Sequence, residues 1–316
     1  DGDRQEEDAT EFYGLGIEKY YSISAEHGRG IGDLIADILG ELPPVAKDDA
    51  AENEVRLAVI GRPNVGKSSL VNKMLGYERV VANPVAGTTR DSIDSPITYN
   101  GKRYTLIDTA GIRRKGRVSQ KLEKYSIIQA LKGMDRAHVV MLLIDAEEGI
   151  TEQDLTIAGY ALERGRAIIL VVNKWDTLTK DNYTMKKFTD EVRLQFKFIP
   201  FAPIMFVSAL TGQRVAKIMD TVEEVAVQFN RKISTSELNR VLQEAEQAHQ
   251  PAMYHGKRVK FFYITQTAVR PPTFTIFVNK EKGVHFSYRR YIANKIRAPF
   301  GFSGCPLRIN YRDRER

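Results

Sequence analysis

The sequence has a single cysteine and no apolar run long enough to cross a membrane. Its longest apolar stretches, residues 139–144 and 167–172, fall far short of the roughly 20 residues that a membrane-spanning helix needs and are typical of buried strands. Cys305 has no second cysteine for an internal disulfide or a zinc cluster. Residues 1–10 have neither the basic start nor the apolar centre of a secretory signal. We therefore expect a protein of the reducing cytoplasm that has no membrane partner.

Positive charge is concentrated at one end of the 316 residues. Residues 251–316 contain 14 Lys and Arg but only 3 Asp and Glu, a net charge of +11, so the preceding 250 residues sum to −4 of the total of +7. A segment this basic is typical of a surface that meets nucleic acid, above all RNA, or an acidic partner. A solvated basic surface without a partner is the alternative.

The sequence pattern divides the chain into segments. Residues 44–54 are polar and acidic, as in an interdomain linker. Over residues 55–231, apolar strand-like runs alternate with helical stretches, which predicts an α/β domain with a mostly parallel sheet and one hairpin at Asn100 and Gly101. Residues 232–316 show the order α-β-β-α-β, opened by a capping box at Ser234, and predict a small α+β domain.

The segment GRPNVGKS, residues 61–68, matches the phosphate-binding pattern GxxxxGK[ST] directly after a predicted strand and at the start of a predicted helix. Its glycines let consecutive N–H groups point at the β-phosphate, where the helix N-terminus adds a favourable field. We expect Lys67 to reach the β and γ oxygens and Ser68 to bind Mg²⁺. The nucleotide contacts predicted here are Gly61, Arg62, Pro63, Asn64, Val65, Gly66, Lys67, Ser68 and Ser69.

Three further short motifs, DTAG, NKWD and SAL, each follow a predicted strand. Asp108 would hold Mg²⁺ through water, and the Gly111 N–H would face the γ-phosphate. The Asp176 carboxylate can accept from N1–H and N2–H of guanine, which adenine lacks. Ligands of open α/β sheets bind at the carboxyl ends of strands, so the set predicts a site for GTP or GDP with Mg²⁺. The predicted contacts are Asp108, Thr109, Ala110, Gly111, Asn173, Lys174, Asp176 and, through a backbone contact to guanine O6, Ser208, Ala209 and Leu210.

A polar loop, AGTTRD at residues 86–91, lies between the phosphate-binding segment and DTAG. We expect it to be mobile and to close onto Mg²⁺ when the γ-phosphate is present. Thr89 is the favoured Mg²⁺ ligand and Thr88 the alternative; an ordinary polar loop is the other interpretation.

Together, GRPNVGKS, GTTRD, DTAG, NKWD and SAL resemble the translation-factor-related GTPases that include Era, the MnmE proteins and the Der (EngA) family, and the domain order is most similar to the Der family. This resemblance implies that residues 55–231 are a second GTPase domain and residues 232–316 a KH-like domain. Residues 1–43 resemble the last strand and helix of a first GTPase domain, as in a truncated chain. The implied activity is that of a monomeric GTPase switch in assembly of the large ribosomal subunit. The implied partners are that subunit or its rRNA and a GTPase-activating partner.

The residue after DTAG is Ile112, where many GTPases have a glutamine that orients the attacking water. An alkyl side chain can neither donate nor accept a hydrogen bond. In the resembled class, the asparagine that matches Asn64 binds K⁺ together with backbone carbonyls of the loop that matches Thr88 and Thr89. The resemblance therefore implies slow, K⁺-stimulated hydrolysis with Asn64, Lys67 and Thr89 as catalytic residues. The alternative is that Asn64 only shapes its loop.

Residues 301–304, GFSG, fit the GxxG text of KH modules but lie between a predicted helix and the last strand. A KH module clamps RNA with GxxG between two helices, so we interpret this segment as a structural turn. RNA contacts are instead expected through phosphates, at Lys257, Lys260, Arg289, Arg290 and Arg297.

Two other functions are considered. One is a passive RNA-binding protein with a vestigial nucleotide pocket, against which the intact Lys67, Ser68, Asp108 and Asp176 argue. The other is a tRNA-modifying GTPase, but MnmE-like proteins carry a cysteine in a C-terminal catalytic motif, and residues 312–316 here are RDRER.

Overall fold

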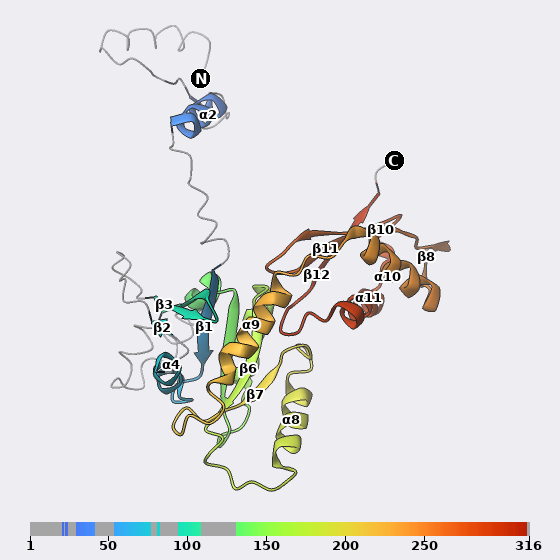
Figure 1. The fold of residues 1–316 in the computed structure, drawn as a ribbon. Helices are drawn as coiled ribbons and strands as arrows, with labels where there is room; N and C mark the ends of the chain where they lie inside the picture. The colour runs from blue at the N-terminus through green and yellow to red at the C-terminus, as the bar shows by residue number, and fades with distance from the viewer. Residues whose placement is uncertain are drawn as a thin grey trace, which may run out of the picture. The chain divides into compact units, whose positions relative to one another are not determined.

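The structure is a computed structural model that describes residues 21, 23–24, 30–41, 54–76, 81–82, 94–108 and 131–314 (Figure 1). The chain divides into two units, Asp1–Glu52 and Asn53–Arg316. In the first unit, helix α2 (Ile31–Glu41) forms where the sequence resembles the last helix of a GTPase domain. Ile35 and Ile38 on this helix are both about half exposed. None of the helices in the described ranges is long and apolar enough to cross a bilayer.

The second unit begins with a seven-stranded sheet in the order β2-β3-β4-β1-β5-β6-β7. Strands β4, β1, β5, β6 and β7 run parallel to one another. Strand β3 is antiparallel to both of its neighbours, β2 and β4. This confirms the predicted α/β class with a mostly parallel sheet. The strand bounds are β1 (Val55–Gly61), β2 (Val81–Ala82), β3 (Ser95–Tyr99), β4 (Lys102–Leu106), β5 (Val139–Asp145), β6 (Ala167–Asn173) and β7 (Ile204–Phe206).

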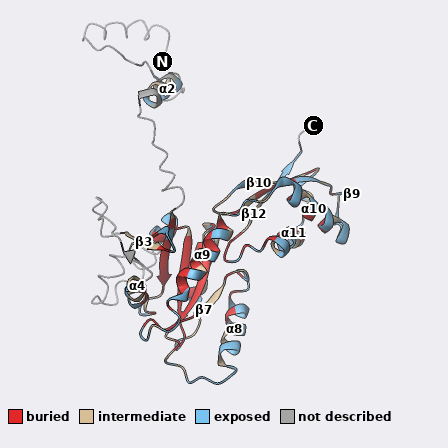
Figure 2. Cartoon of the chain, in the orientation of Figure 1, coloured by how far each residue is buried: buried red, intermediate tan, exposed pale blue. Residues whose placement is uncertain are grey.

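The central strands β5 and β6 are buried at every residue, which explains their continuous apolar sequence (Figure 2). Alternate side chains of β5 enter two different cores: Met141 and Leu143 pack in one, and Leu142 and Ile144 in the other. The first core also contains buried residues of α4 (Lys67–Leu75) and α9 (Lys217–Phe229). The second contains residues of α7 (Glu152–Glu163) and α8 (Thr184–Gln195). A parallel sheet covered on both faces follows from this division.

The predicted hairpin is confirmed at Asn100 and Gly101, which connect β3 and β4 with φ values of 49° and 73°. Two successive positive φ values define the turn that matches strand twist, and the Asn-Gly pair adopts them with little strain. Tyr99 and Lys102 are therefore directly opposite each other.

The C-terminal domain confirms the predicted α-β-β-α-β order. Ser234 and Glu237 form the expected capping box at the start of its first helix. Its main sheet has the order β10-β11-β12, with β10 and β11 antiparallel and β11 and β12 parallel. The elements are α10 (Thr235–Ala248), β8 (Met253–Tyr254), β9 (Lys257–Arg258), β10 (Phe261–Ala268), β11 (Thr273–Val278), the 3-10 helix η4 (Glu281–Gly283), α11 (Phe286–Phe300) and β12 (Arg308–Asp313).

The run RVKFFYIT at residues 258–265 predicts one continuous strand, but the structure interrupts this strand, so the predicted bounds were wrong. Arg258 ends the short β8–β9 pair and Phe261 begins β10. Between them, Val259 is buried, and the Lys260 N–H donates to the Asn279 side chain at 2.9 Å. The Lys260 N–H thus bonds to a side chain in place of a main-chain carbonyl, which the apolar run does not reveal.

Residues 301–304 connect the C-terminal domain to the GTPase-like sheet. The Ile168 N–H donates to the Gly304 carbonyl at 2.7 Å, and the Gly304 N–H donates to the Phe201 carbonyl at 2.8 Å. A Cβ on Gly304 would lie 2.7 Å from a methyl carbon of Val225, so glycine is required at this contact. The interpretation of GFSG as a structural turn is confirmed.

The prediction that Arg297 contacts RNA was wrong. Its guanidinium donates to the carbonyls of Phe302 at 2.9 Å and Cys305 at 2.6 Å, and it lies 4.2 Å from the centre of the Phe201 ring. Burial lowers the pKa of Arg297 to about 10. Sequence shows the charge of this arginine but not that the turn after α11 folds back over it. Arg289 also forms a hydrogen bond within the C-terminal domain, since its Nε donates to the Val284 carbonyl at 3.0 Å.

Candidate functional site

The phosphate-binding segment lies between the end of β1 and the start of α4, as predicted. Gly61 and Gly66 have φ values of 147° and 94°. A Cβ on Gly61 would lie 2.6 Å from the Leu143 carbonyl, and one on Gly66 would lie 2.3 Å from the amide nitrogen of Asn173. Both glycines are therefore needed for close approach as well as for backbone conformation.

Lys67 is the first residue of α4, and its ammonium group folds over the loop. Its Nζ donates to the carbonyl oxygens of Gly61, at 2.8 Å, and Arg62. Ser68 and Ser69 follow in the first turn of the same helix, with Ser68 half-buried and Ser69 exposed. The helix N-terminus and the lysine thus meet at one point, as an anion site requires.

Asn173 joins three of the predicted motifs. Its side-chain amide donates to the Val65 carbonyl at 2.8 Å, and its Oδ1 accepts from the Ala209 N–H at 2.9 Å. The residue is buried at the end of β6. The structure therefore brings the phosphate-binding loop, NKWD and SAL together. The backbone contact to guanine O6 that is expected from Ser208, Ala209 and Leu210 stays a prediction.

Asp176 has the clearest signature of a ligand site. Within the part of the chain that the structure describes, its buried Oδ1 has no hydrogen-bond partner. A buried polar atom left unpaired costs about 1–3 kcal/mol, so an external donor at this position is favourable. The preceding residue, Trp175, packs against Phe206 and Phe188 with ring centroids 4.4 Å and 5.7 Å away, and this packing holds the loop. The predicted contact of Asp176 with the N–H groups of guanine would supply such a donor.

Lys174 forms an ion pair with Asp145, which the sequence interpretation missed. Their Nζ and Oδ2 atoms are 2.5 Å apart, and Lys174 has a φ of 58°. Burial raises the pKa of Asp145, but the hydrogen bonds from Lys174 and the Glu147 N–H lower it by more. The pKa of Asp145 therefore lies below the ordinary value. The hydrogen bond to Asp145 raises the pKa of Lys174. The available signal was the position of Asp145 at the end of a buried strand, the position that Asn173 also occupies in the next strand.

The Arg62 side chain does not face the phosphate site. Its Nε lies 3.1 Å from both carboxylate oxygens of Asp154, and its Nη1 lies 2.7 Å from Glu148. Burial alone would lower the pKa of Arg62, but these carboxylates raise it. Asp154 also accepts from the Thr151 N–H at 3.0 Å and so caps α7. Only the backbone of Arg62 is left for the predicted nucleotide contact.

Asp108 follows β4 with a φ of 56°, and its N–H donates to Asp94 Oδ1 at 3.0 Å. The Ile107 N–H donates to the Leu57 carbonyl at 2.8 Å, which keeps this segment beside β1. Of the predicted Mg²⁺ ligands, Ser68 and Asp108 are described. The predictions for Thr88, Thr89, Thr109, Ala110, Gly111 and Ile112 lie outside the described residues.

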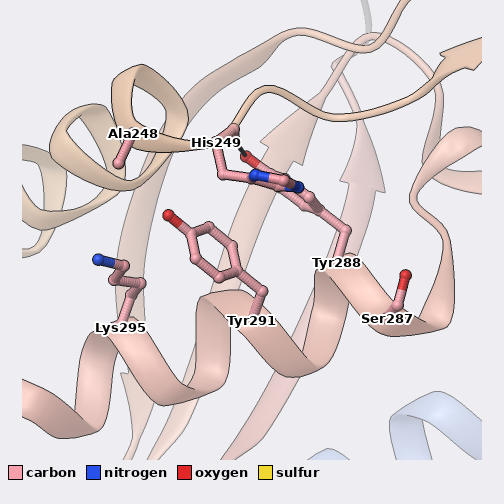
Figure 3. Close-up of a pocket in the computed structure, with 6 residues that line it drawn as sticks. All are labelled: Ala248, His249, Ser287, Tyr288, Tyr291 and Lys295. Carbon is pink, nitrogen blue, oxygen red and sulfur yellow. Dashed lines mark hydrogen bonds between the residues drawn. The ribbon is translucent and has the colours of Figure 1, made fainter.

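A separate pocket of about 400 Å³ lies between α10 and α11 of the C-terminal domain (Figure 3). The Tyr288 hydroxyl donates to the His249 carbonyl at 2.8 Å, and the Tyr291 hydroxyl donates to the Ala245 carbonyl at 2.9 Å. Lys295 Nζ lies 5.5 Å from the centre of the Tyr291 ring. The two tyrosines thus serve to fix the helices, and the pocket has no paired acid and base. Its lining residues are Ala248, His249, Ser287, Tyr288, Tyr291 and Lys295.

The fold and this site define a P-loop protein that binds a guanine nucleotide. Residues 56–174 match the family model described as 50S ribosome-binding GTPase, and residues 232–312 match the KH-domain-like model of EngA bacterial GTPase enzymes, C-terminal. GTPase Der of Syntrophotalea carbinolica is 67% identical over 315 residues, which are 99% of this chain and 72% of that protein. GTPase Der of Geotalea uraniireducens is 56% identical over 100% of this chain and 71% of the length of that protein. The chain therefore belongs to the Der family of GTPases.

A more distant similarity links the chain to a solved structure of Era in complex with MgGDPNP and a segment of 16S ribosomal RNA. The TM-score is 0.42 and the identity 20%, over 83% of this chain and 93% of that chain. Membership of the Der family confirms the predicted resemblance and makes this chain an enzyme that hydrolyses GTP. It does not favour the passive RNA-binding or tRNA-modifying alternatives.

Proposed function

We propose that this chain is a GTP-driven switch in assembly of the large ribosomal subunit, acting as a monomer on that subunit or its rRNA, with a GTPase-activating partner. Strand β6 contacts both the KH-like domain and the phosphate loop, and this observation supports the proposal most directly. At its start, the Ile168 N–H binds Gly304 of the KH-like domain, and at its end, Asn173 links the phosphate loop to the guanine-binding motif. A nucleotide-dependent change around Asn173 therefore acts on the strand that carries the basic domain.

The nucleotide would be held in defined roles. The loop of residues 61–69 and Lys67 would bind the phosphates, and Asp176 would select guanine. Mg²⁺ would be held by Ser68, by Asp108 through water, and by Thr89, with Thr88 as the alternative. The orphaned Asp176 oxygen and the position of Lys67 at the start of α4 support these assignments. When bound, the cation neutralises charge between the β and γ phosphates.

Asn64 would bind K⁺, and the ion would offset the charge that develops between the β and γ oxygens during hydrolysis. Asn64 is exposed, has a φ of 64°, and its side chain forms no hydrogen bond to other described residues. Non-glycine residues at positive φ are concentrated at functional sites, although asparagine tolerates this conformation better than most. Its amide oxygen is therefore free to coordinate a monovalent cation, which would stabilise charge in the transition state.

The domain assignment belongs to the same proposal. Residues 1–43 would be the end of a preceding GTPase domain and residues 44–54 a linker. Residues 55–231 would form the GTPase domain described above and residues 232–316 the KH-like domain. The division of the chain between Glu52 and Asn53 and the helix α2 support this arrangement.

Co-sedimentation with purified ribosomal subunits tests the proposed function. The chain should pellet with the large subunit when loaded with a non-hydrolysable GTP analogue, and less with GDP. Asp176→Asn, which should lose guanine binding, is the control for nucleotide dependence. Equal pelleting in all nucleotide states, or pelleting only with the small subunit, would contradict the proposal.

A further inference from the structure

The β10-β11-β12 sheet has one covered face and one open face. Ile264, Ile276 and Tyr311 share a face through their register and are buried against α10 and α11. The alternate residues of these strands point to the opposite side, where β10 and β12 carry exposed positions (Figure 2). The residues on the open face decide what can bind there.

Aromatic rings occupy one end of the open face. Tyr263 and Phe277 are partners across β10 and β11, and their rings stack with centroids 4.4 Å apart and planes inclined by 16°. Phe262 stands at the irregularity in the β10 register next to them. Phe262 and Tyr263 are each 40% exposed. Large rings left this open on a sheet form a flat platform to which another planar group can stack.

Arginines extend the same face along β12. Arg312 is the register partner of Phe277, and Arg308 is the partner of Thr273. The guanidinium of Arg314 lies 4.9 Å from the centre of the Phe262 ring. All three arginines are exposed, and they span about 20 Å at the rise of a strand.

The one acidic residue of strands β10, β11 and β12 is turned away from this face. Asp313, between two of these arginines, points to the other side and accepts from the Glu281 N–H at 2.6 Å. Arg308 donates to the main-chain carbonyl of Glu163, at 3.1 Å, at the end nearest the GTPase domain. Thr265, Thr275 and Asn310 fill the positions between. The described strands thus present positive and aromatic side chains with no carboxylate among them.

We propose that this surface, which we call the arginine–aromatic face (Phe262, Tyr263, Phe277, Arg308, Arg312 and Arg314), binds single-stranded RNA. Unpaired bases stack on the rings of Tyr263 and Phe262, and the arginines bind the phosphates of the same strand. Every base has a face that stacks on an aromatic ring, so binding is weakly dependent on sequence and strongly dependent on salt. The inference rests on the proposed function, because ribosomal RNA would supply the strand.

The position of residues 301–304 favours this face over the usual KH route. A KH module binds RNA through GxxG, but here Gly304 is bonded to Ile168 and Phe201 of the GTPase domain. An acidic protein segment would also meet the arginines, yet it would leave the stacked rings without a planar partner. Combined stacking and phosphate contacts therefore point to a nucleic acid.

Fluorescence anisotropy of the full chain with a labelled, unstructured 12-nucleotide RNA tests the proposal. Tyr263→Thr and Arg312→Gln keep strand-compatible residues at exposed positions, so the fold and GTP hydrolysis should be unchanged. The double variant should bind at least tenfold more weakly. Arg312→Gln alone should reduce the slope of log affinity against log salt by about 0.7, the value for one phosphate contact on a single strand. Phe286→Ala and Lys295→Ala, an exposed ring and the pocket lysine on α11, should bind as the unaltered chain does.

Three results would overturn the inference: unchanged RNA binding in the double variant, a loss confined to Lys295→Ala, or preferential binding of an Asp- and Glu-rich peptide. The two proposals fail separately. A chain that binds the RNA through this face but never pellets with the large subunit would contradict the proposed function alone. A double variant that binds the RNA and pellets like the unaltered chain would contradict this inference alone.

Discussion

The Asn173 side chain donates a 2.8 Å hydrogen bond to the Val65 carbonyl, across 108 positions of sequence. Asn173→Ala would leave this carbonyl and the Ala209 N–H unpaired in a buried site. We expect the free energy of unfolding to fall by about 1–3 kcal/mol and GDP affinity to fall with it. Thermal unfolding and fluorescent GDP titration measure both effects. Asn72→Ala, on the exposed side of α4, is the matched control. Equal stability and equal GDP affinity of the two variants would show that the Asn173 side chain does not stabilise the site.

Guanine selectivity should depend on Asp176. Asp176→Asn replaces one acceptor by a donor that faces the N2–H of guanine, so GTP binding should weaken by at least about 1–3 kcal/mol. Xanthine has a carbonyl at this position, so the variant should gain affinity for xanthosine triphosphate. Competition titrations with the two nucleotides provide the measurement. Unchanged GTP affinity would remove the guanine assignment.

Hydrolysis should be faster in K⁺ than in Na⁺ at equal ionic strength, because the shorter oxygen distances of Na⁺ suit the Asn64 site less well. Screening depends on ionic strength and not on ion identity, so it cannot produce this difference. Asn64→Ala should lose the K⁺ preference and slow turnover by about tenfold or more, with little change in GDP affinity. Phosphate-release rates in the two salts test this. A variant that still prefers K⁺ would show that Asn64 is not the ligand.

Stability should fall as pH drops through the range set by His138. The pKa of His138 is lowered from its ordinary value of 6.5 to about 4. Burial is the main cause, and the positive charge of the neighbouring Arg56 is the second. The unfolded chain therefore binds this proton first, and the stability from neutral His138 is present above pH 6.5 and is lost between about pH 6.5 and 4. His138→Gln should flatten the change in melting temperature over this range. His255→Gln, in the exposed β8–β9 turn, should not, and identical curves for all three proteins would contradict the assignment.

Docking of the KH-like domain should be sensitive to Gly304. Gly304→Ala places a Cβ 2.7 Å from Val225, whereas Gly301→Ala places one 3.4 Å from the Gln228 side chain. Both glycines have positive φ, at 73° and 81°, so alanine strains the backbone at either position, and only Gly304→Ala adds a clash closer than 3 Å. We expect Gly304→Ala to be the less stable by about 1–3 kcal/mol in chemical denaturation. Equal stability would mean that Val225 moves aside.

The sequence predicted those parts of the site that are contiguous in the chain. The phosphate-binding loop has a pattern whose glycines and lysine act through local backbone geometry, and the structure has Gly61, Gly66 and Lys67 where that geometry requires. The Asn100–Gly101 hairpin and the Ser234 capping box are local in the same way. Such features need no knowledge of the rest of the fold.

Features that depend on distant partners were missed or wrong. Arg297 was expected at an RNA surface because sequence shows charge, but the turn of residues 301–305 encloses it. The binding of the Arg62 guanidinium by Asp154 of α7 was missed, and the predicted nucleotide contact of the Arg62 backbone stays a prediction. The pairing of Lys174 with Asp145 joins two strands whose adjacency the sequence only implies. Burial and partner choice are set by tertiary packing, which no local pattern encodes.

Asp154 binds both the Arg62 guanidinium and the Thr151 N–H that begins α7. The carboxylate that caps α7 is therefore also one of the groups that hold the loop after β1, so fraying at the start of the helix weakens the attachment of the loop. Local opening of the two segments is then energetically coupled. Amide protons in the first turn of α7 and in the loop at residues 62–66 then exchange with solvent through a shared fluctuation, although 92 positions separate the paired side chains.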